Sequence, residues 1–88
     1  MVWRGAILKT NSELVREFLS RCFDKNYITD YDDSSTFSDL DFDSLDKIEM
    51  AMDFEREFDI IIESDLVSEL NTVSDFINCI IIKIDDKE

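Results

Sequence analysis

Apolar side chains recur every three or four residues in three stretches of the chain, and this spacing predicts three amphipathic helices. The stretches cover residues 11–23, 44–58 and 73–84. One short run, Ile60-Ile61-Ile62, has the composition of a strand, but the sequence offers no second convincing strand to pair with it. We therefore expect a buried connector at residues 59–63 and an all-α chain.

Polar residues mark where two of these helices begin. Thr10 and Glu13 have the spacing of a capping box before the first helix, and Thr72 and Asp75 have the same spacing before the last. Residues 64–70 predict a short capped helix of one or two turns. The expected fold is a small four-helix bundle with three longer helices and one short helix.

The segment between the first two helices, residues 24–43, has no sustained period and is rich in Asp, Ser, Thr and Asn. It is predicted to be a long loop pinned by scattered apolar residues. A connection of this length is unusual in a small domain and is often functional. The polar residues 85–88 are expected to fray, and residues 1–9 fit either a helix extension or a packed arm.

The helix predicted at residues 44–58 has two apolar stripes where core packing needs only one. We expect one stripe to be core: Met50, Ala51, Phe54 and Phe58. The other is either a broad flank of the core or a surface for a partner: Leu45, Ile48 and Met52. A third sector of the helix gathers four carboxylates: Asp46, Glu49, Asp53 and Glu57.

Ser44 is the residue best placed to carry a chemical modification. Counting back from the apolar period places Asp43 at the N-cap, Ser44 at the first helical position and Asp46 at the third. An Asp43 carboxylate that accepts from the first-turn amides would leave the Ser44 hydroxyl free. Unpaired amides and the helix dipole favour an anion there, so the position suits a phosphate. Taken alone, however, Asp-Ser before a helix more often means a plain cap.

The composition narrows the function classes. The 88 residues make one small domain, and 44% of them are apolar, which favours a folded core over a disordered acidic tail. The net charge of −13 would repel nucleic acid and anionic membrane surfaces and favours partners with basic patches. The sequence contains no histidine, the usual general base near neutral pH and the commonest metal ligand. We therefore expect neither an enzyme nor a metal site.

The two cysteines and the lack of long apolar runs indicate in which cellular compartment the protein is expected. Cys22 and Cys79 are far apart in sequence and belong to no Cys-x-x-Cys motif, so we expect two thiols packed on helix faces in a reducing compartment. No segment approaches the length of a membrane span, and residues 1–9 lack the apolar run of a signal peptide. A cytoplasmic protein without membrane insertion is expected.

From Thr36 to about Ile80, roughly half the chain, the sequence resembles the acyl carrier proteins, which are small acidic four-helix bundles. The resemblance rests on these residues: Asp39-Leu40, Asp43-Ser44-Leu45-Asp46, Glu49, Glu55-Arg56-Glu57-Phe58-Asp59, Ile62 and Thr72-Val73. Asp-Ser-Leu at a helix start, followed about ten residues later by Glu-x-Glu-Phe, is fairly specific in a domain of this size. Residues 1–88 would then form a single acyl-carrier-like domain.

The resemblance implies a carrier that holds acyl groups as thioesters on a 4'-phosphopantetheine arm attached to Ser44. Asp43, next to it, would be recognised by the phosphopantetheinyl transferase that adds the arm. Acyl-loading and acyl-processing enzymes with basic docking patches would bind the second helix of a monomeric carrier. The residues expected to bind these partners are Leu45, Asp46, Ile48, Glu49, Met52, Asp53 and Glu55. The pathway would be fatty-acid synthesis or a specialised acyl or polyketide synthesis.

Three features depart from the usual pattern of that family. Asp41 and Phe42 stand where the family usually has Gly and a small residue, the segment between Phe37 and Asp39 is one residue shorter than usual, and Glu63 replaces a common Pro. A bulky Phe42 beside Ser44 suggests that the partners differ from the housekeeping fatty-acid enzymes. A carrier dedicated to a specialised acyl or an aminoacyl group is therefore an alternative.

Two further alternatives come from other classes. Asp39, Asp41 and Asp43 reproduce the opening of a calcium-binding EF-hand loop, but Ser44 stands where Gly is needed and Met50 where the bidentate Glu should be. An acidic helical interaction module without the prosthetic group is the other. The helix-start position of Ser44 favours the carrier.

Overall fold

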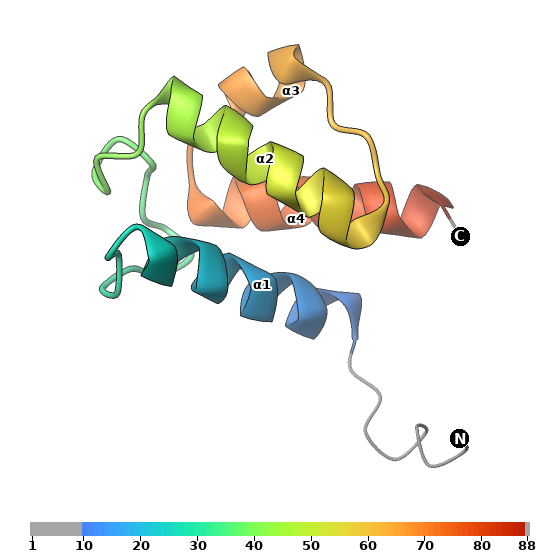
Figure 1. Ribbon diagram of the computed structural model, residues 1–88, viewed down its shortest axis with the longest axis horizontal. Coiled ribbons are helices and arrows are strands. Elements are labelled where there is room, and N and C mark those ends of the chain that lie inside the picture. The colour runs from blue at the N-terminus through green and yellow to red at the C-terminus, as the bar shows by residue number, and fades with distance from the viewer. Residues whose placement is uncertain (1–9, 88) are drawn as a thin grey trace.

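The computed structural model describes residues 10–87 and contains four helices (Figure 1). They are α1 (Asn11–Lys25), α2 (Ser44–Phe58), α3 (Ser64–Glu69) and α4 (Val73–Lys87). Among these residues the one β-type contact is an isolated antiparallel bridge between Thr36 and Thr72. The predicted all-α class is confirmed, with three longer helices and one short helix. Residues 1–9, predicted to be either a helix extension or a packed arm, lie outside the described residues.

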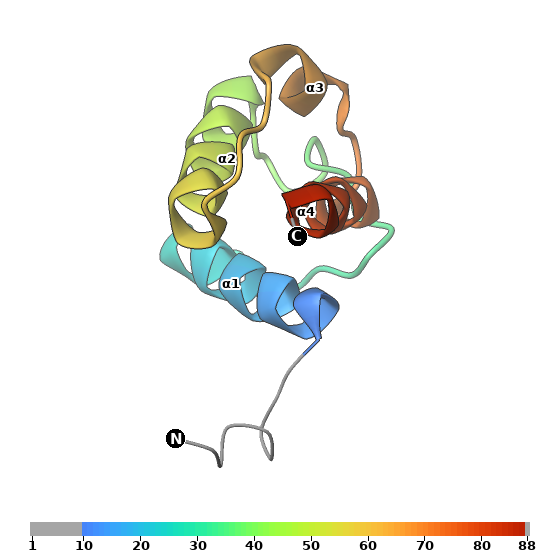
Figure 2. The ribbon, with the colours of Figure 1, turned by 90° about the vertical axis from the view of Figure 1, so that its right-hand side faces the viewer.

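The three longer helices surround a common interior, and α3 closes it on the side between α2 and α4 (Figure 2). α1 packs against α4, and α2 packs against α3. Each long helix turns its apolar stripe inward, because burying these side chains removes apolar surface from water at about 25 cal/mol per Å². On α2 the buried stripe is the one predicted to be core, with Met50, Ala51 and Phe54 almost fully buried and Phe58 partly so.

Phenylalanine rings form much of the interior. The Phe54 ring meets Phe18 of α1 at 4.7 Å between centroids and Phe76 of α4 at 5.1 Å, both edge to face. A second group surrounds Phe23, and Phe37 joins the two groups through a contact of 6.0 Å with Phe76. Edge-to-face pairs at these separations stabilise a core beyond simple area burial. The rings therefore tie three helices and the long loop into one core.

α1 begins at the predicted capping box. Thr10 Oγ1 accepts from the Glu13 amide at 3.1 Å, and Glu13 Oε1 accepts from the Thr10 amide at 2.8 Å. The helix continues to Lys25, two residues beyond the predicted end. There the Asn26 side chain donates to the carbonyl of Cys22 at 2.9 Å, which satisfies one of the last free carbonyls of the helix.

The loop from residue 26 to residue 43 is anchored at several points. Arg16 of α1 donates two hydrogen bonds to the Asp33 carboxylate, at 2.8 and 2.9 Å. The hydrogen bond from Arg16 holds the pKa of Asp33 below its usual range. Phe37 donates its amide to the Asn71 carbonyl, and Val73 donates its amide to a carbonyl of the loop. The loop is thereby fixed both to α1 and to the connection between α3 and α4.

The connector after α2 is irregular, as predicted. Ile60 and Ile62 are buried, whereas Ile61 between them is 76% exposed. Glu55 Oε2 accepts from the Ile62 amide at 2.7 Å and holds the connector against α2. One detail of the prediction is wrong: α3 has no side-chain cap, because its N-cap residue Glu63 makes no capping hydrogen bond.

α4 starts at the predicted box, in which Thr72 Oγ1 accepts from the Asp75 amide at 3.0 Å. Its end differs from the prediction of a frayed tail, since the helix continues through Lys87. Asp85 accepts a hydrogen bond from Asn11 at 3.0 Å, and Lys87 Nζ lies 3.4 Å from the Asp59 carboxylate. These contacts with α1 and with the end of α2 hold the last turn in place.

Candidate functional site

Ser44 is the first residue of α2 and is exposed, as the sequence predicted. Asp43 Oδ1 accepts from the Asp46 amide at 2.9 Å, and Asp46 Oδ2 accepts from the Asp43 amide at 3.3 Å. Because this capping box occupies both carboxylates, the Ser44 hydroxyl has no hydrogen-bond partner among residues 10–87. The predicted cap is confirmed, and the hydroxyl is free to react.

A tight turn leads the chain to Ser44. The amides of Leu40 and Phe42 both donate to carbonyls of residues 36–37, which folds the loop back on itself. Asp41 has a φ of 60°, in the left-handed region that glycine adopts most easily and that Asp tolerates better than most residues. This conformation explains why the position suits Gly. In this chain Asp41 adopts the same conformation.

Phe42, the bulky residue two positions before Ser44, is buried. Its side chain is only 5% exposed and packs edge to face on Phe23 of α1, with the ring centroids 5.4 Å apart. Residue 42 is buried, whereas residues 41 and 43 on either side of it are exposed. A partner at Ser44 would therefore meet little of this ring, and the inference from Phe42 to different partners stays a prediction.

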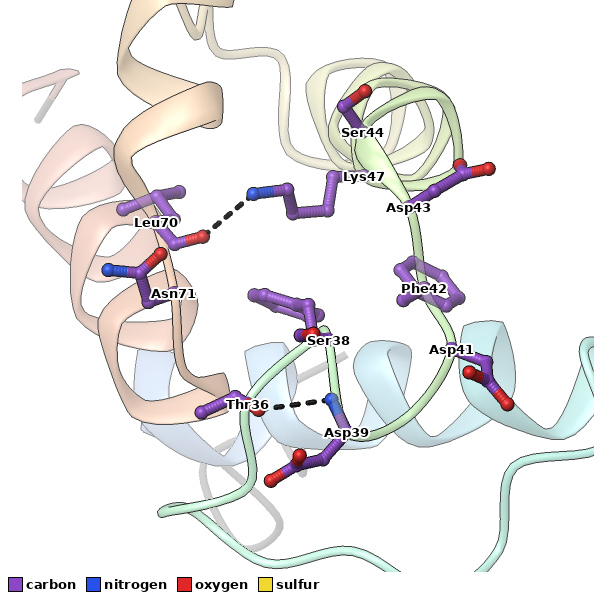
Figure 3. A pocket seen from close by; sticks show the side chains of 11 residues that line it. Thr36, Ser38, Asp39, Asp41, Phe42, Asp43, Ser44, Lys47, Leu70 and Asn71 are labelled. Carbon is purple, nitrogen blue, oxygen red and sulfur yellow. Dashed lines mark hydrogen bonds between the residues drawn. The ribbon is translucent and has the colours of Figure 1, made fainter.

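An open pocket of about 770 Å³ lies beside Ser44 (Figure 3). Three segments line it: the first turn of α2, the loop turn at residues 36–43, and the connection at Leu70 and Asn71. The lining is mixed, with carboxylates and hydroxyls around the face of Phe37. The site is thus a shallow polar recess with the free hydroxyl at its rim.

Lys47 is the residue at this site that the sequence reasoning missed. Its Nζ donates to the Leu70 carbonyl at 2.9 Å and lies 5.7 Å from the centroid of the Phe37 ring (Figure 3). The contact joins α2 to the connection between α3 and α4. A signal was present in the sequence, since a cation close to the start of a helix opposes the helix dipole and needs a compensating contact.

The second apolar stripe of α2 lies largely on the surface. Leu45 is 61% exposed and Met52 is 47% exposed, whereas Ile48 is partly buried against the core. The stripe is therefore core at Ile48 only, and its use as a surface for a partner stays a prediction. Leu45 and Met52 form an exposed apolar surface, and Ile48 connects that surface to the interior.

The carboxylates expected to bind partners fall into different surroundings. Asp46 and Asp53 border the cleft between α1 and α2, with Glu49 at the same rim. Asp53 pairs with Arg56 one turn further along the helix. Glu55 is partly buried and uses its carboxylate to hold the connector at Ile62. Glu55 thus has a structural task, and its role with a partner stays a prediction.

The three aspartates of the calcium alternative do not form a common site. Figure 3 shows the carboxylates of Asp39, Asp41 and Asp43 on different sides of the turn. Within residues 10–87 no group of three acidic, cysteine or histidine side chains is placed to hold a metal ion. An EF-hand loop would need these oxygens to converge at about 2.3–2.6 Å from one cation.

Both cysteines are free thiols, and both are sheltered. Burial raises the pKa of the Cys22 thiol to about 11, and burial also raises the pKa of Cys79. Because the thiolate is the reactive form, we expect Cys22 at pH 8 to react with a chromogenic disulfide more than about a hundredfold more slowly than free cysteine. A time course with and without denaturant, assigned with Cys22→Ser, measures this. Rapid reaction of Cys22 in the folded protein would contradict the assigned burial.

The sequence is similar to known carrier proteins. The profile of the family described as "Phosphopantetheine attachment site" matches residues 13–80. An acyl carrier protein of Karelsulcia muelleri is 48% identical over 56 residues, which are 64% of this chain and 68% of that protein. An acyl carrier protein of Buchnera aphidicola is 33% identical over 73 residues, which are 83% of this chain and 91% of that protein.

The fold agrees with these similarities. The crystal structure of an acyl carrier protein from Thermotoga maritima superposes with a TM-score of 0.76 at 31% identity, covering 89% of this chain and 94% of the other. Within residues 10–87 no helix combines the length and the apolar character needed to cross a membrane. The similarity to these proteins thus extends well beyond the residues next to Ser44.

Proposed function

The chain belongs to the acyl carrier protein family, and from that premise we propose that Ser44 is the residue that bears the family's covalent phosphopantetheine. The observation that carries this proposal is the free, exposed Ser44 hydroxyl at the first position of α2. When bound, the group supplies a terminal thiol that holds acyl cargo as a thioester. Members of this family carry acyl groups and do not catalyse their reactions.

The residues around Ser44 fit a phosphodiester. The capping box uses the amide of Asp46, so the amides of Ser44 and Leu45 keep no acceptor among the described residues. Amides of this kind and the positive end of the helix dipole favour an anion. The recess of about 770 Å³ beside the hydroxyl leaves room for the group without moving a core side chain.

The chemistry of attachment assigns simple tasks to this chain. The Ser44 oxygen bonds to the phosphorus of the pantetheine phosphate of coenzyme A, and the bond from that phosphorus to the adenosine bisphosphate breaks. The hydroxyl proton passes to a base of the transferase, because the sequence holds no histidine and the nearby Asp43 carboxylate is engaged in the cap. Asp43 fixes the helix start and thereby the position of the hydroxyl.

Partners of this carrier are expected to be synthesis enzymes and a phosphopantetheinyl transferase, as the family implies. We place their docking surface on the exposed face of α2, at Leu45 and Met52, with Asp46, Glu49 and Asp53 beside it. An apolar centre with an acidic rim suits a basic patch that presents an apolar side chain. We further propose that residues 1–88 act as one cytoplasmic monomeric domain in fatty-acid or specialised acyl synthesis.

The proposal is tested by incubating the purified chain with coenzyme A, magnesium and a broad-specificity phosphopantetheinyl transferase. Intact mass should rise by one phosphopantetheine. The product should also gain one fast-reacting thiol, distinct from the sheltered Cys22. An unchanged mass, under conditions that modify a control carrier, would leave an acidic interaction module as the better description.

The docking surface leads to a prediction about Met52. Met52→Ala should change the free energy of unfolding by no more than about 0.5 kcal/mol, because the side chain is 47% exposed. It should still slow modification of Ser44 several-fold by lowering kcat/KM for the transferase. Steady-state kinetics and thermal melts measure the two effects.

Two variants serve as controls for Met52. Ile82→Ala removes a similarly exposed apolar side chain, 60% exposed, from α4 and should leave the rate unchanged. Phe54→Ala removes a fully buried ring and should cost about 3–5 kcal/mol of stability. Ile48 is a poorer probe, since it packs partly on the core. Equal rates for Met52→Ala and the parent would remove Met52 from the docking surface.

A further inference from the structure

Lys47 is a partly buried cation that has no carboxylate partner among the residues that the structure describes. Four other basic residues do form ion pairs within residues 10–87: Arg16 with Asp33, Arg56 with Asp53, Lys83 with Glu63 and Lys87 with Asp59. Within this described part of the chain, the contacts of Lys47 Nζ are a neutral carbonyl and an aromatic face. Withdrawing a charge from water is costly unless the charge is paired and hydrogen-bonded.

The absence of a carboxylate partner is notable because carboxylates surround Lys47. Asp39, Asp41 and Asp43 line the same recess, yet none forms an ion pair with it. The Asp43 carboxylate faces the α2 amides, and the other two point away from the ammonium (Figure 3). Among the residues that line the recess, Lys47 is the one cation.

Ser44 and Lys47 are three residues apart on α2, so they lie on the same face of the helix with about 5–6 Å between their Cβ atoms. Both line the recess. An anion bonded to the Ser44 oxygen would therefore stand within reach of the Lys47 ammonium. That ammonium has three donors and needs only one for the Leu70 carbonyl.

The proposed modification places one such anion there. A phosphodiester on Ser44 adds a negative charge beside four aspartates, at residues 39, 41, 43 and 46. Without a nearby cation these charges would repel the group and drive it toward solvent. An ion pair with Lys47 would offset the repulsion and direct the group over the recess toward the connection at Leu70.

Resting on the proposed function, we propose that Lys47 is a positioning residue that binds the phosphodiester on Ser44 while keeping its contact with the Leu70 carbonyl. The Lys47 ammonium then has two partners. The Leu70 carbonyl is present in the unmodified fold, and the phosphodiester is present only after modification of Ser44. Lys47 is not catalytic, since it acts on where the group lies. Its effect on stability should therefore depend on whether Ser44 is modified.

The test compares thermal midpoints of unmodified and modified protein for the parent and for Lys47→Met, which keeps the stem and removes the charge. The change in midpoint on modification should be about 2–5 °C more favourable in the parent, as expected for a partly exposed ion pair in a domain of this size. At about 1 M sodium chloride the difference should largely vanish. The ³¹P chemical shift of the phosphodiester should differ between the parent and Lys47→Met.

Lys47→Arg should behave like the parent in both measurements, because it retains the charge. Lys87→Met is the matched control: it removes a lysine at the far end of α4, and its cost should be the same with and without modification (Figure 1). Equal midpoint changes in the parent and Lys47→Met, with an unaltered ³¹P shift, would overturn this inference alone. Failure of Ser44 to gain mass would overturn the proposed function and this inference with it.

Discussion

Replacing Ser44 by Ala should abolish the gain of mass on incubation with coenzyme A and the transferase, because no other oxygen occupies the first position of α2. The fold should persist, since the capping box uses the side chains of Asp43 and Asp46 and makes no use of the Ser44 hydroxyl. Intact mass and circular dichroism of the same sample measure both effects. The rate of modification should fall below detection.

Ser38→Ala is the matched control for this result. Ser38 is also exposed and lines the same recess, so a transferase that modified any accessible hydroxyl there would use it as well. The Ser38→Ala protein should be modified as fast as the parent. If Ser44→Ala still gained the full mass while Ser38→Ala did not, the attachment residue would lie in the loop and not on α2.

Phe42→Ala should be among the most destabilising single changes in the chain. The ring is 5% exposed and touches Phe23 and Phe37 at centroid distances of 5.4 and 5.9 Å. Loss of a buried ring together with the cavity left behind typically costs about 3–5 kcal/mol. In a domain of this size that loss should lower the thermal midpoint by at least about 12 °C. Denaturant and thermal unfolding measure the change.

Tyr27 provides the comparison for Phe42, because it is an aromatic residue of the same loop but is 93% exposed. Tyr27→Ala should therefore change stability by no more than about 0.5 kcal/mol. Similar small effects for both variants would mean that Phe42 does not join the loop to the core. The orientation of the chain as it enters Ser44 would then need another explanation.

Local sequence signals predicted the helices well because each signal depends on neighbouring residues. The boxes at Thr10 and Thr72 and the cap at Asp43 require only residues three positions apart, and all three occur as expected. The apolar period likewise selected the buried face of α2 around Phe54. The position of Ser44 relative to the cap was predicted the same way, whereas its role as an attachment residue came from the resemblance to a family.

Contacts between distant segments explain what the sequence did not predict. Phe42 packs on Phe23, which lies in another helix, and the polar tail stays helical because Asn11 and Asp59 contact it. The contact of Lys47 with Leu70 joins residues 23 positions apart. No local pattern encodes such pairings, and they appear only when the helices are packed.

The attachment of phosphopantetheine to Ser44 is tested most directly on the protein isolated from its own cell. Intact mass, followed by fragmentation of the peptide that contains Asp43, Ser44 and Leu45, locates any added group to one residue. We expect one phosphopantetheine, with or without acyl cargo, on Ser44. An unmodified Ser44 peptide throughout, from cells whose other carriers are modified, would contradict it.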